Sequence, residues 1–198
     1  MTINKVINSL FSSCTYVFDV GESSIWLVDC GDVEPLLSLI GKKQLMGVLL
    51  THAHFDHIYG LNELLKHFSN TLVYTNECGK DTLLDARKNM SLYHETSFVF
   101  DYPENIRIVN DGDMIELSNE LNAKVIGTPG HHPSCQTYII GDAIFTGDSY
   151  IPGTKVVTIL PKGNKKLAQD SVEKILLMSE GRIIYPGHYV KETTKFII

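Results

Sequence analysis

Histidines in this 198-residue chain gather in short segments that also carry carboxylates. The densest segment, Thr51-His52-Ala53-His54-Phe55-Asp56-His57, places four potential metal ligands within six residues. Side chains alternate sides along an extended backbone, so His52, His54 and Asp56 can converge on one side. A helix predicted from residue 58 turns His57 in a different direction, so the segment could serve two adjacent metal positions. The alternative is a polar strand-to-helix loop with a capping Asp. It is disfavoured because the preceding strand, the ligand-type side chains of the loop and the following helix all agree with a metal-binding loop.

Three further turns place a His or an Asp just beyond the end of a predicted strand. They are Thr128-Pro129-Gly130-His131-His132, Phe145-Thr146-Gly147-Asp148 and Tyr185-Pro186-Gly187-His188. Each turn contains glycine, and each would say little on its own. Functional groups on loops that a rigid sheet holds are a common arrangement, so the co-occurrence of these turns with the first segment predicts one shared site.

The elements that must position these groups are strands and helices mixed through both halves of the chain. Apolar and β-branched runs predict strands at residues 14–18, 24–28, 46–50, 72–75, 106–109, 114–117, 123–126, 136–140, 143–145 and 182–185. Helical spacing predicts helices at residues 33–40, 58–68, 164–180 and, inside the irregular segment 76–102, at 77–86. The helix at 164–180 is expected to bury an apolar side made of Leu167, Val172, Ile175, Leu176 and Leu177. The class is therefore α/β or α+β, with a sheet core covered by helices.

The composition is that of an ordinary globular protein. Hydrophobic residues make up 43% of the chain and charged residues 20%, and the length predicts a single domain over residues 1–198. A net charge of −6 disfavours binding to nucleic acid or to an anionic membrane, and leaves the oligomeric state open. No segment has the length and apolarity of a signal peptide or a membrane span. The four cysteines form no Cys-x-x-Cys pair, so we expect reduced thiols and a cytoplasmic protein.

The sequence resembles the metallo-β-lactamase fold hydrolases. The resemblance is carried by His52-Ala53-His54-Phe55-Asp56-His57 and by the turns ending at His131, Asp148 and His188, which occur in the family's order. Leu27-Val28-Asp29-Cys30-Gly31 is also similar to the strand and turn that precede the metal loop in this family. The resemblance implies an α/β fold, a four-layered αββα sandwich, with the metal site along one edge.

By the same resemblance, the ligands would divide between two divalent ions. His52, His54 and His131 would hold the first ion, and Asp148 would bridge to the second. Asp56, His57 and His188 would complete the second position. Imidazole and carboxylate ligands suit zinc, and iron or manganese would also fit. No Cys aligns with a ligand position, so the lactamase class with a Cys ligand is disfavoured.

The expected reaction is metal-assisted hydrolysis of an ester or thioester of a small molecule. Two divalent ions, offset by Asp56, Asp148 and a bridging hydroxide, would leave a charge of about +1 that attracts an anionic or polarised carbonyl substrate. Metal binding lowers the pKa of water from about 15.7 to about 7, which makes metal-bound hydroxide available as the nucleophile at neutral pH. Asp56 would orient the attacking water or accept its proton, and a metal would steady the oxyanion.

The motif spacing looks like the small glyoxalase II-like branch, whose members hydrolyse thioesters of hydroxy acids. This chain differs from that branch in having His132, where Thr is frequent, and Tyr150-Ile151-Pro152-Gly153-Thr154-Lys155 in place of a Gly-Arg turn. It also ends ten residues after His188, so we expect it to lack the helical region that grips glutathione in full-length glyoxalase II.

Candidate substrate contacts beside the ligand turns are His132, Tyr150, Lys155 and Tyr189. Lys162, Lys165 and Lys166 could also meet a substrate carboxylate, whereas His67 and His94 are expected to play no part. Two other activities remain compatible with the ligand set: a mononuclear iron oxidoreductase that oxidises persulfides, and a lactonase or phosphodiesterase of the same fold.

Overall fold

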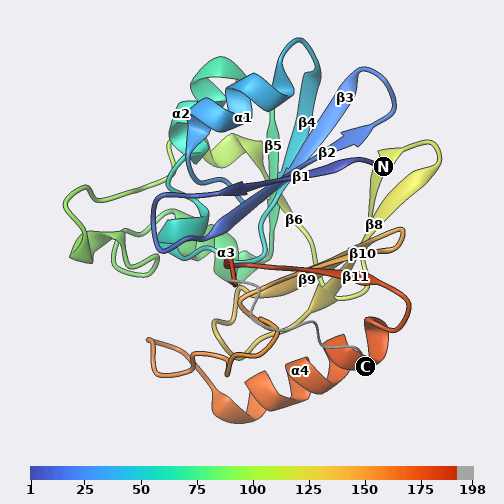
Figure 1. Ribbon diagram of the computed structural model, residues 1–198. Coiled ribbons are helices and arrows are strands. Elements are labelled where there is room, and N and C mark those ends of the chain that lie inside the picture. The colour runs from blue at the N-terminus through green and yellow to red at the C-terminus, as the bar shows by residue number, and fades with distance from the viewer. Residues whose placement is uncertain (191–198) are drawn as a thin grey trace.

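Two β-sheets pack face to face, and helices cover the outer face of each sheet (Figure 1). The structure is a computed structural model that describes residues 1–190, so the last eight residues of the predicted domain over 1–198 lie outside the described residues. The α/β class and the four-layered αββα sandwich are thereby confirmed.

The first sheet contains six strands in the order β1-β2-β3-β4-β5-β6. Its strands are β1 (Ile3–Ile7), β2 (Cys14–Val20), β3 (Ser24–Val28), β4 (Gln44–Leu49), β5 (Leu72–Thr75) and β6 (Ile106–Ile108). The pairs from β1 to β3 are antiparallel, and those from β3 to β6 are parallel. Parallel neighbours need crossovers, and these contain α1 (Val33–Ile40), α2 (Leu61–His67) and α3 (Glu77–Leu83).

The second sheet contains five strands in the order β11-β10-β9-β8-β7. Its strands are β7 (Met114–Ser118), β8 (Leu121–Gly127), β9 (Gln136–Ile140), β10 (Ala143–Gly147) and β11 (Ile183–Pro186). From β7 to β10 the neighbours are antiparallel, whereas β11 pairs parallel with β10. The crossover before β11 contains α4 (Lys165–Met178), which runs along the outer side of this sheet (Figure 1).

Side chains of the first sheet alternate between two apolar cores, as the pleat of a β-strand requires. Phe18 and Trp26 point toward the second sheet and share a core with Phe145. Leu27 belongs instead to the core under the helices, which also contains Leu64 of α2. Burial on both faces explains why these strands read as continuous apolar runs in the sequence.

Small side chains, and not the leucines that the pattern indicated, pack α4 against the protein. Its buried residues are Ala168, Ser171 and Ile175, while Leu177 is 82% exposed. The approach is close, because a Cβ added at Gly130 would lie 2.3 Å from the Ala168 backbone. A tight helix contact excludes large side chains. The predicted apolar side is therefore wrong except at Ile175.

The strand β1 and the shape of the predicted helix at 58–68 are the other differences. β1 lies at a sheet edge with most of its side chains partly exposed, so its sequence carries little apolar periodicity. Instead of one helix over residues 58–68, the structure has the shorter helix α2, and a 3-10 turn at Phe55–His57, labelled η1, precedes it. Two further 3-10 turns are η2 (Ser91–Tyr93) and η3 (Pro103–Asn105). Within residues 1–190, every helix is too short or too polar to cross a membrane.

Candidate metal centre

The four turns singled out in the sequence meet at one edge of the sandwich, where strand ends from both sheets come together. The amide of Gln136 in β9 donates to the carbonyl of Thr51 after β4, at 2.7 Å. The amide of Cys14 in β2 donates to the carbonyl of Gly187 after β11, also at 2.7 Å. Ser13 and His188 form an isolated antiparallel bridge. These links between the sheets hold the turns in a common site.

Two glycines permit the turns to approach this closely. Gly147 has φ +50°, and a Cβ there would lie 2.5 Å from the Cβ of Thr51. A Cβ at Gly187 would lie 2.2 Å from Oδ1 of Asp148. Any side chain at these positions would push the turns apart, so the Thr-Gly-Asp and Pro-Gly-His patterns have a steric cause.

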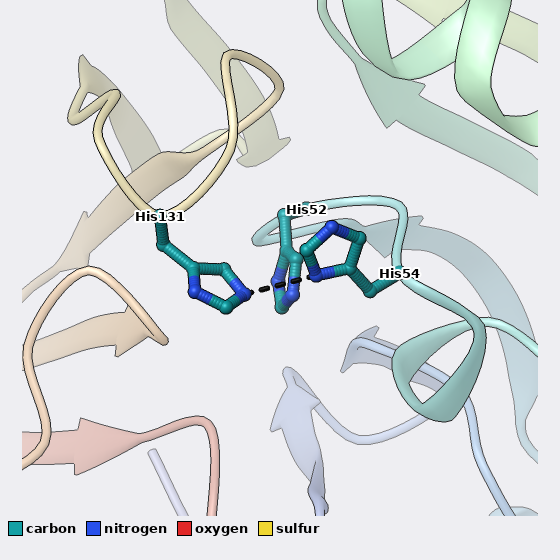
Figure 2. Close-up of side chains that lie close together, drawn as sticks. All are labelled: His52, His54 and His131. Carbon is teal, nitrogen blue, oxygen red and sulfur yellow. Dashed lines mark hydrogen bonds between the residues drawn. The ribbon is translucent and has the colours of Figure 1, made fainter. Parts of the chain in front are cut away.

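His52, His54 and His131 form the first cluster of potential ligands. One ring nitrogen of each lies within 4.8 Å of the corresponding atoms of the other two. Figure 2 shows the three rings converging from two loops, with Nδ1 of His54 and Nε2 of His131 2.9 Å apart. These nitrogens bound a small space that three imidazole donors surround.

Asp56, His57 and His188 form the second cluster, with donor atoms again within 4.8 Å of one another. Oδ2 of Asp56 lies 3.4 Å from Nε2 of His57 and 3.3 Å from Nε2 of His188. The side chain of Asp56 is 14% exposed, so its carboxylate also reaches the open side of the site.

Asp148 lies between the two clusters. Its Oδ2 is 3.5 Å from Nε2 of His131 and 3.3 Å from Nε2 of His188, and its Oδ1 is 3.5 Å from Nε2 of His57. Oδ1 also groups with His52 and His57 as a third set of potential ligands. One carboxylate thus contacts residues of both clusters, which is the position that a bridging ligand requires.

Four of the imidazoles are held through Nδ1, which leaves Nε2 facing the centre. Nδ1 of His131 lies 2.8 Å from the carbonyl of Val157, and Nδ1 of His188 lies 3.0 Å from the carbonyl of Phe11. Carbonyls only accept, so both Nδ1 atoms carry a proton, and Nε2 is the nitrogen of each ring that can give a lone pair to a metal. His52 and His57 use Thr51 and Asp29 in the same way. Partners of this kind fix the tautomer and orientation of metal ligands.

Asp29 organises the centre from the end of β3, a role that the sequence analysis did not assign. Its carboxylate accepts from the amide of Thr51 at 2.7 Å, from the hydroxyl of Thr51 at 2.7 Å and from Nδ1 of His57 at 2.9 Å. The residue is buried and has φ +60°, a left-handed conformation that Asp tolerates better than most residues. The Leu27-Val28-Asp29 strand end was visible in the sequence, but its partners were not.

The described residues fit divalent metal ions. Nε2 of His52, Nε2 of His54 and Oδ1 of Asp148 are buried without a hydrogen-bond partner. An unsatisfied buried polar atom costs about 1–3 kcal/mol. His54 faces the cluster through Nδ1, so the unsatisfied atoms at the centre are Nε2 of His52 and Oδ1 of Asp148, and both indicate that something else satisfies them. The donor set of five imidazoles and two carboxylates is typical of zinc and suits iron or manganese as well.

The pKa values of histidines in the two clusters shift in opposite directions. Burial and the neighbouring His131 lower the pKa of His54 to about 3, and burial lowers the pKa of His52 well below its usual value. Burial alone would also lower the pKa of His57, but Asp56, Asp29 and Asp148 raise it to about 9. Against burial, Asp148 and Asp56 raise the pKa of His188 to about 11. Without metal, His52 and His54 are therefore neutral, whereas the second cluster is a set of imidazolium–carboxylate pairs.

Both acidic ligands stay ionised despite their burial. Burial alone would raise the pKa of Asp148, but the hydrogen bond from His188 and the charge of His57 lower it. The same opposition lowers the pKa of Asp56, where His57 and His188 outweigh burial. The centre thus presents two carboxylates at neutral pH, ready to bind cations.

Of the four predicted substrate contacts, only Lys155 is among the described residues that line the cavities at the centre. Lys155 lines a cavity of about 300 Å³ beside Asp148 and His188. His132 is buried, with Nδ1 2.7 Å from the hydroxyl of Ser134, and the described walls of the cavities at the centre do not include it. Burial there lowers the pKa of His132 to about 4. A contact between His132 and substrate therefore has no support in this geometry.

Tyr150 and Tyr189 likewise lie outside the described walls of these cavities. The ring of Tyr189 faces the ammonium group of Lys5 at 5.0 Å, and the backbone carbonyl of Tyr150 accepts from Thr146. His67 is exposed on α2, as expected, but His94 lines a cavity of about 330 Å³ at the centre. The expectation that His94 plays no part is not supported by this position.

Several known proteins are similar to this chain in sequence. Residues 8–188 match the family described as the metallo-beta-lactamase superfamily. The probable metallo-hydrolase YqgX of Bacillus subtilis is 32% identical over 146 residues, covering 72% of this chain and 68% of that protein. Hydroxyacylglutathione hydrolase of Pectobacterium carotovorum is 27% identical over 174 residues, covering 84% of this chain. The chain spans only 58% of the length of that second relative.

Solved structures of similar shape share the fold. The BLEG-1 B3 metallo-beta-lactamase superposes with a TM-score of 0.84 at 24% identity, covering 96% of this chain and 92% of that one. TTHA1623 in a di-iron-bound form gives 0.80 at 24% identity, with 94% and 92% covered. ETHE1 from Myxococcus xanthus gives 0.75 at 24% identity, with 98% and 78% covered. At 24% sequence identity, the similarity of these structures shows a shared fold and nothing more.

Proposed function

Because this chain belongs to the metallo-β-lactamase superfamily, we propose that it is a dinuclear metal-dependent hydrolase that cleaves thioesters. The observation that carries the proposal is the position of Asp148, whose carboxylate lies within 3.5 Å of His57, His131 and His188 at once. A carboxylate that contacts both histidine clusters favours two ions over one.

In this proposal His52, His54 and His131 would hold one ion, and Asp56, His57 and His188 would hold a second. Asp148, which lies between the two clusters, would be available to both. When bound, two divalent ions, zinc by preference, supply Lewis acidity for the substrate carbonyl and lower the pKa of a water molecule.

The protein's own groups do the positioning. Asp56 is ionised, lines the 330 Å³ cavity and has one carboxylate oxygen 3.3 Å from His188, so it can orient a water molecule and accept its proton. Asp29, Thr51 and backbone carbonyls fix the imidazoles before substrate arrives. Rigid positioning of this kind reduces the reorganisation needed in the transition state.

The choice of a thioester rests on two supports. Two relatives bear the name hydroxyacylglutathione hydrolase at 27% and 28% identity, and that name denotes a thioesterase. In addition, a thiol has a pKa of about 8.5, so a thiolate departs without the strong general acid that an amine or alkoxide needs. In the proposed site the imidazoles and carboxylates would serve as metal ligands, which suits a leaving group that needs no proton donor.

Metal analysis followed by a substrate panel tests the proposal. Protein purified without added metal and then loaded with zinc should hold two ions per chain and hydrolyse thioesters, and chelation should abolish turnover until zinc is restored. His67→Ala is the matched control, because this exposed histidine on α2 should leave both metal content and turnover unchanged. Stoichiometric iron together with oxygen uptake that depends on a persulfide would overturn the hydrolase proposal in favour of the oxidoreductase.

A further inference from the structure

One wall of the centre is apolar. The cavity of about 330 Å³ is bounded on one side by the potential ligands and on the other by Phe11, Phe55, Met90, Val157 and Leu160, with His94 as the polar member. Ligand-binding cavities begin at about this volume and carry mostly apolar walls with a few polar groups.

This wall is built from segments far apart in the chain. Phe11 comes from the loop between β1 and β2, and Met90 and His94 come from the irregular segment before β6. Val157 and Leu160 come from the loop between β10 and α4. The ring of His94 lies 5.7 Å from that of Phe11 and 5.0 Å from that of Phe55, which ties two of these segments to the metal-binding loop.

The backbone of the wall is fixed to the centre itself. The carbonyl of Phe11 accepts from Nδ1 of His188, and the carbonyl of Val157 accepts from Nδ1 of His131. Phe11 and Met90 also adopt φ +53° and +71°, which is costly for residues with large side chains. Strained residues cluster at binding sites, where surrounding contacts hold them in place. The wall is therefore a fixed part of the site.

Charge distinguishes this cavity from its neighbour. No Lys or Arg stands among the described residues that line the 330 Å³ cavity, so an anionic group there would find no Lys or Arg side chain to pair with. The adjoining cavity of about 300 Å³ shares Asp148, Val157 and His188 with it and adds the cation Lys155. The two cavities thus adjoin at the same ligands but offer different chemistry, one an apolar wall and the other a Lys.

We propose that the substrate is amphiphilic, with an apolar alkyl or aryl group on one side of the scissile bond and an anionic group on the other. The apolar group occupies the cavity walled by Phe11 and Met90, and the anionic group lies toward Lys155. This inference rests on the proposed thioesterase function and narrows its substrate class. It separates this chain from a hydrolase of hydroxyacylglutathione, whose two halves are both polar.

Matched thioesters test the inference. Zinc-loaded protein is assayed with 4-phenylbutanoyl and acetyl thioesters of 3-mercaptopropionate, with acetyl thioesters of phenylethanethiol, and with a hydroxyacylglutathione. Each buried methylene is worth about 0.8 kcal/mol, so kcat/KM should rise up to about fourfold per methylene as the apolar group lengthens. Comparing the two phenyl substrates tells which half of the thioester occupies the apolar cavity.

Single substitutions connect this preference to the wall. Phe11→Ala should lower, about tenfold and mainly through KM, the ratio of kcat/KM for the preferred phenyl substrate to kcat/KM for the acetyl 3-mercaptopropionate thioester. Tyr93→Ala is the matched control, since Tyr93 is 69% exposed and lies outside the described wall, while Phe11 is 65% exposed. Lys155→Gln should raise KM for the anionic substrates only, with Lys66→Gln, an exposed lysine on α2, as its control.

A binding measurement separates failure of this inference from failure of the proposed function. Saturation-transfer NMR with 4-phenylbutyrate should detect binding to the wild-type and Tyr93→Ala proteins and lose it in Phe11→Ala, even if no thioester is hydrolysed. Absence of all thioester turnover would overturn the proposed function. Equal or better turnover of hydroxyacylglutathione, or equal phenylbutyrate binding by the Phe11→Ala and Tyr93→Ala proteins, would overturn the amphiphilic substrate.

Discussion

Replacing Asp29 by Asn tests whether this buried carboxylate sets the tautomer of His57. The backbone of Asp29 has φ +60°, which Asn adopts as readily as Asp, so the substitution leaves the strand end intact. Asn can place only one oxygen where the carboxylate has two. Its Oδ1 must face the amide of Thr51, because a side-chain NH₂ there would set donor against donor at 2.7 Å. Its NH₂ group then faces Nδ1 of His57.

The consequence is a shifted proton on His57. Nδ1 of His57, which lies 2.9 Å from Oδ2 of Asp29, must now accept a hydrogen bond, so the ring carries its proton on Nε2. That nitrogen faces Asp56, Asp148 and His188 and can no longer offer a lone pair to a metal. Loss of such an orienting partner weakens metal binding by about 10- to 100-fold, which corresponds to about 1.4–2.7 kcal/mol. The hydroxyl of Thr51 also donates to Oδ2 of Asp29 at 2.7 Å and lies 3.2 Å from Nδ1 of His52, so the substitution should weaken the ion of the first cluster as well.

The assay is competition for zinc between the metal-free protein and a chromophoric chelator, together with ¹⁵N NMR of the histidine rings to read the tautomer. Wild-type protein should show two binding steps, and Asp29→Asn should weaken both. Asp170→Asn is the matched control, since Asp170 is exposed on α4 and pairs only with Lys166 among its described contacts. Unchanged affinity at both steps in Asp29→Asn, with a folded protein by thermal melting, would refute the tautomer argument.

Three further predictions concern the same centre. Asp148→Ala should lose at least one metal, measured by elemental analysis, and nearly all turnover, since the contact between the two clusters is removed; full metal content would contradict a bridging role. In metal-free protein the raised pKa values of His57, about 9, and His188, about 11, keep both rings protonated at pH 7, so zinc binding should release about two protons and weaken as pH falls. Calorimetry in buffers of different ionisation enthalpy measures this release, and buffer-independent heats would be inconsistent with it. Gly147→Ala should lower the free energy of unfolding by roughly 1–3 kcal/mol in urea titrations, because φ +50° and a Cβ contact at 2.5 Å both oppose a side chain; a wild-type midpoint would argue against that crowding.

Much of the fold was predictable because local patterns coincide with tertiary burial. The runs at 25–28 and 143–145 are continuously apolar, and they lie in β3 and β10, where all of these residues are buried. Predictions failed where burial depends on a distant partner. The leucines of α4 look like a core stripe, but Gly130 brings the backbone so close that Ala168 and Ser171 fill the contact instead.

The sequence by itself determined the chemistry of the centre: which donor types are present, how they are spaced, and that each follows a strand end on a turn. Local geometry suffices for this, since the alternation of an extended segment and the glycine turns act over a few residues. Only the tertiary structure decided that Asp29 fixes His57 and that Phe11, Met90 and His94 wall the cavity. These contacts join residues up to 177 positions apart, as between Phe11 and His188, and arise only when the two sheets pack and carry their loops to one edge.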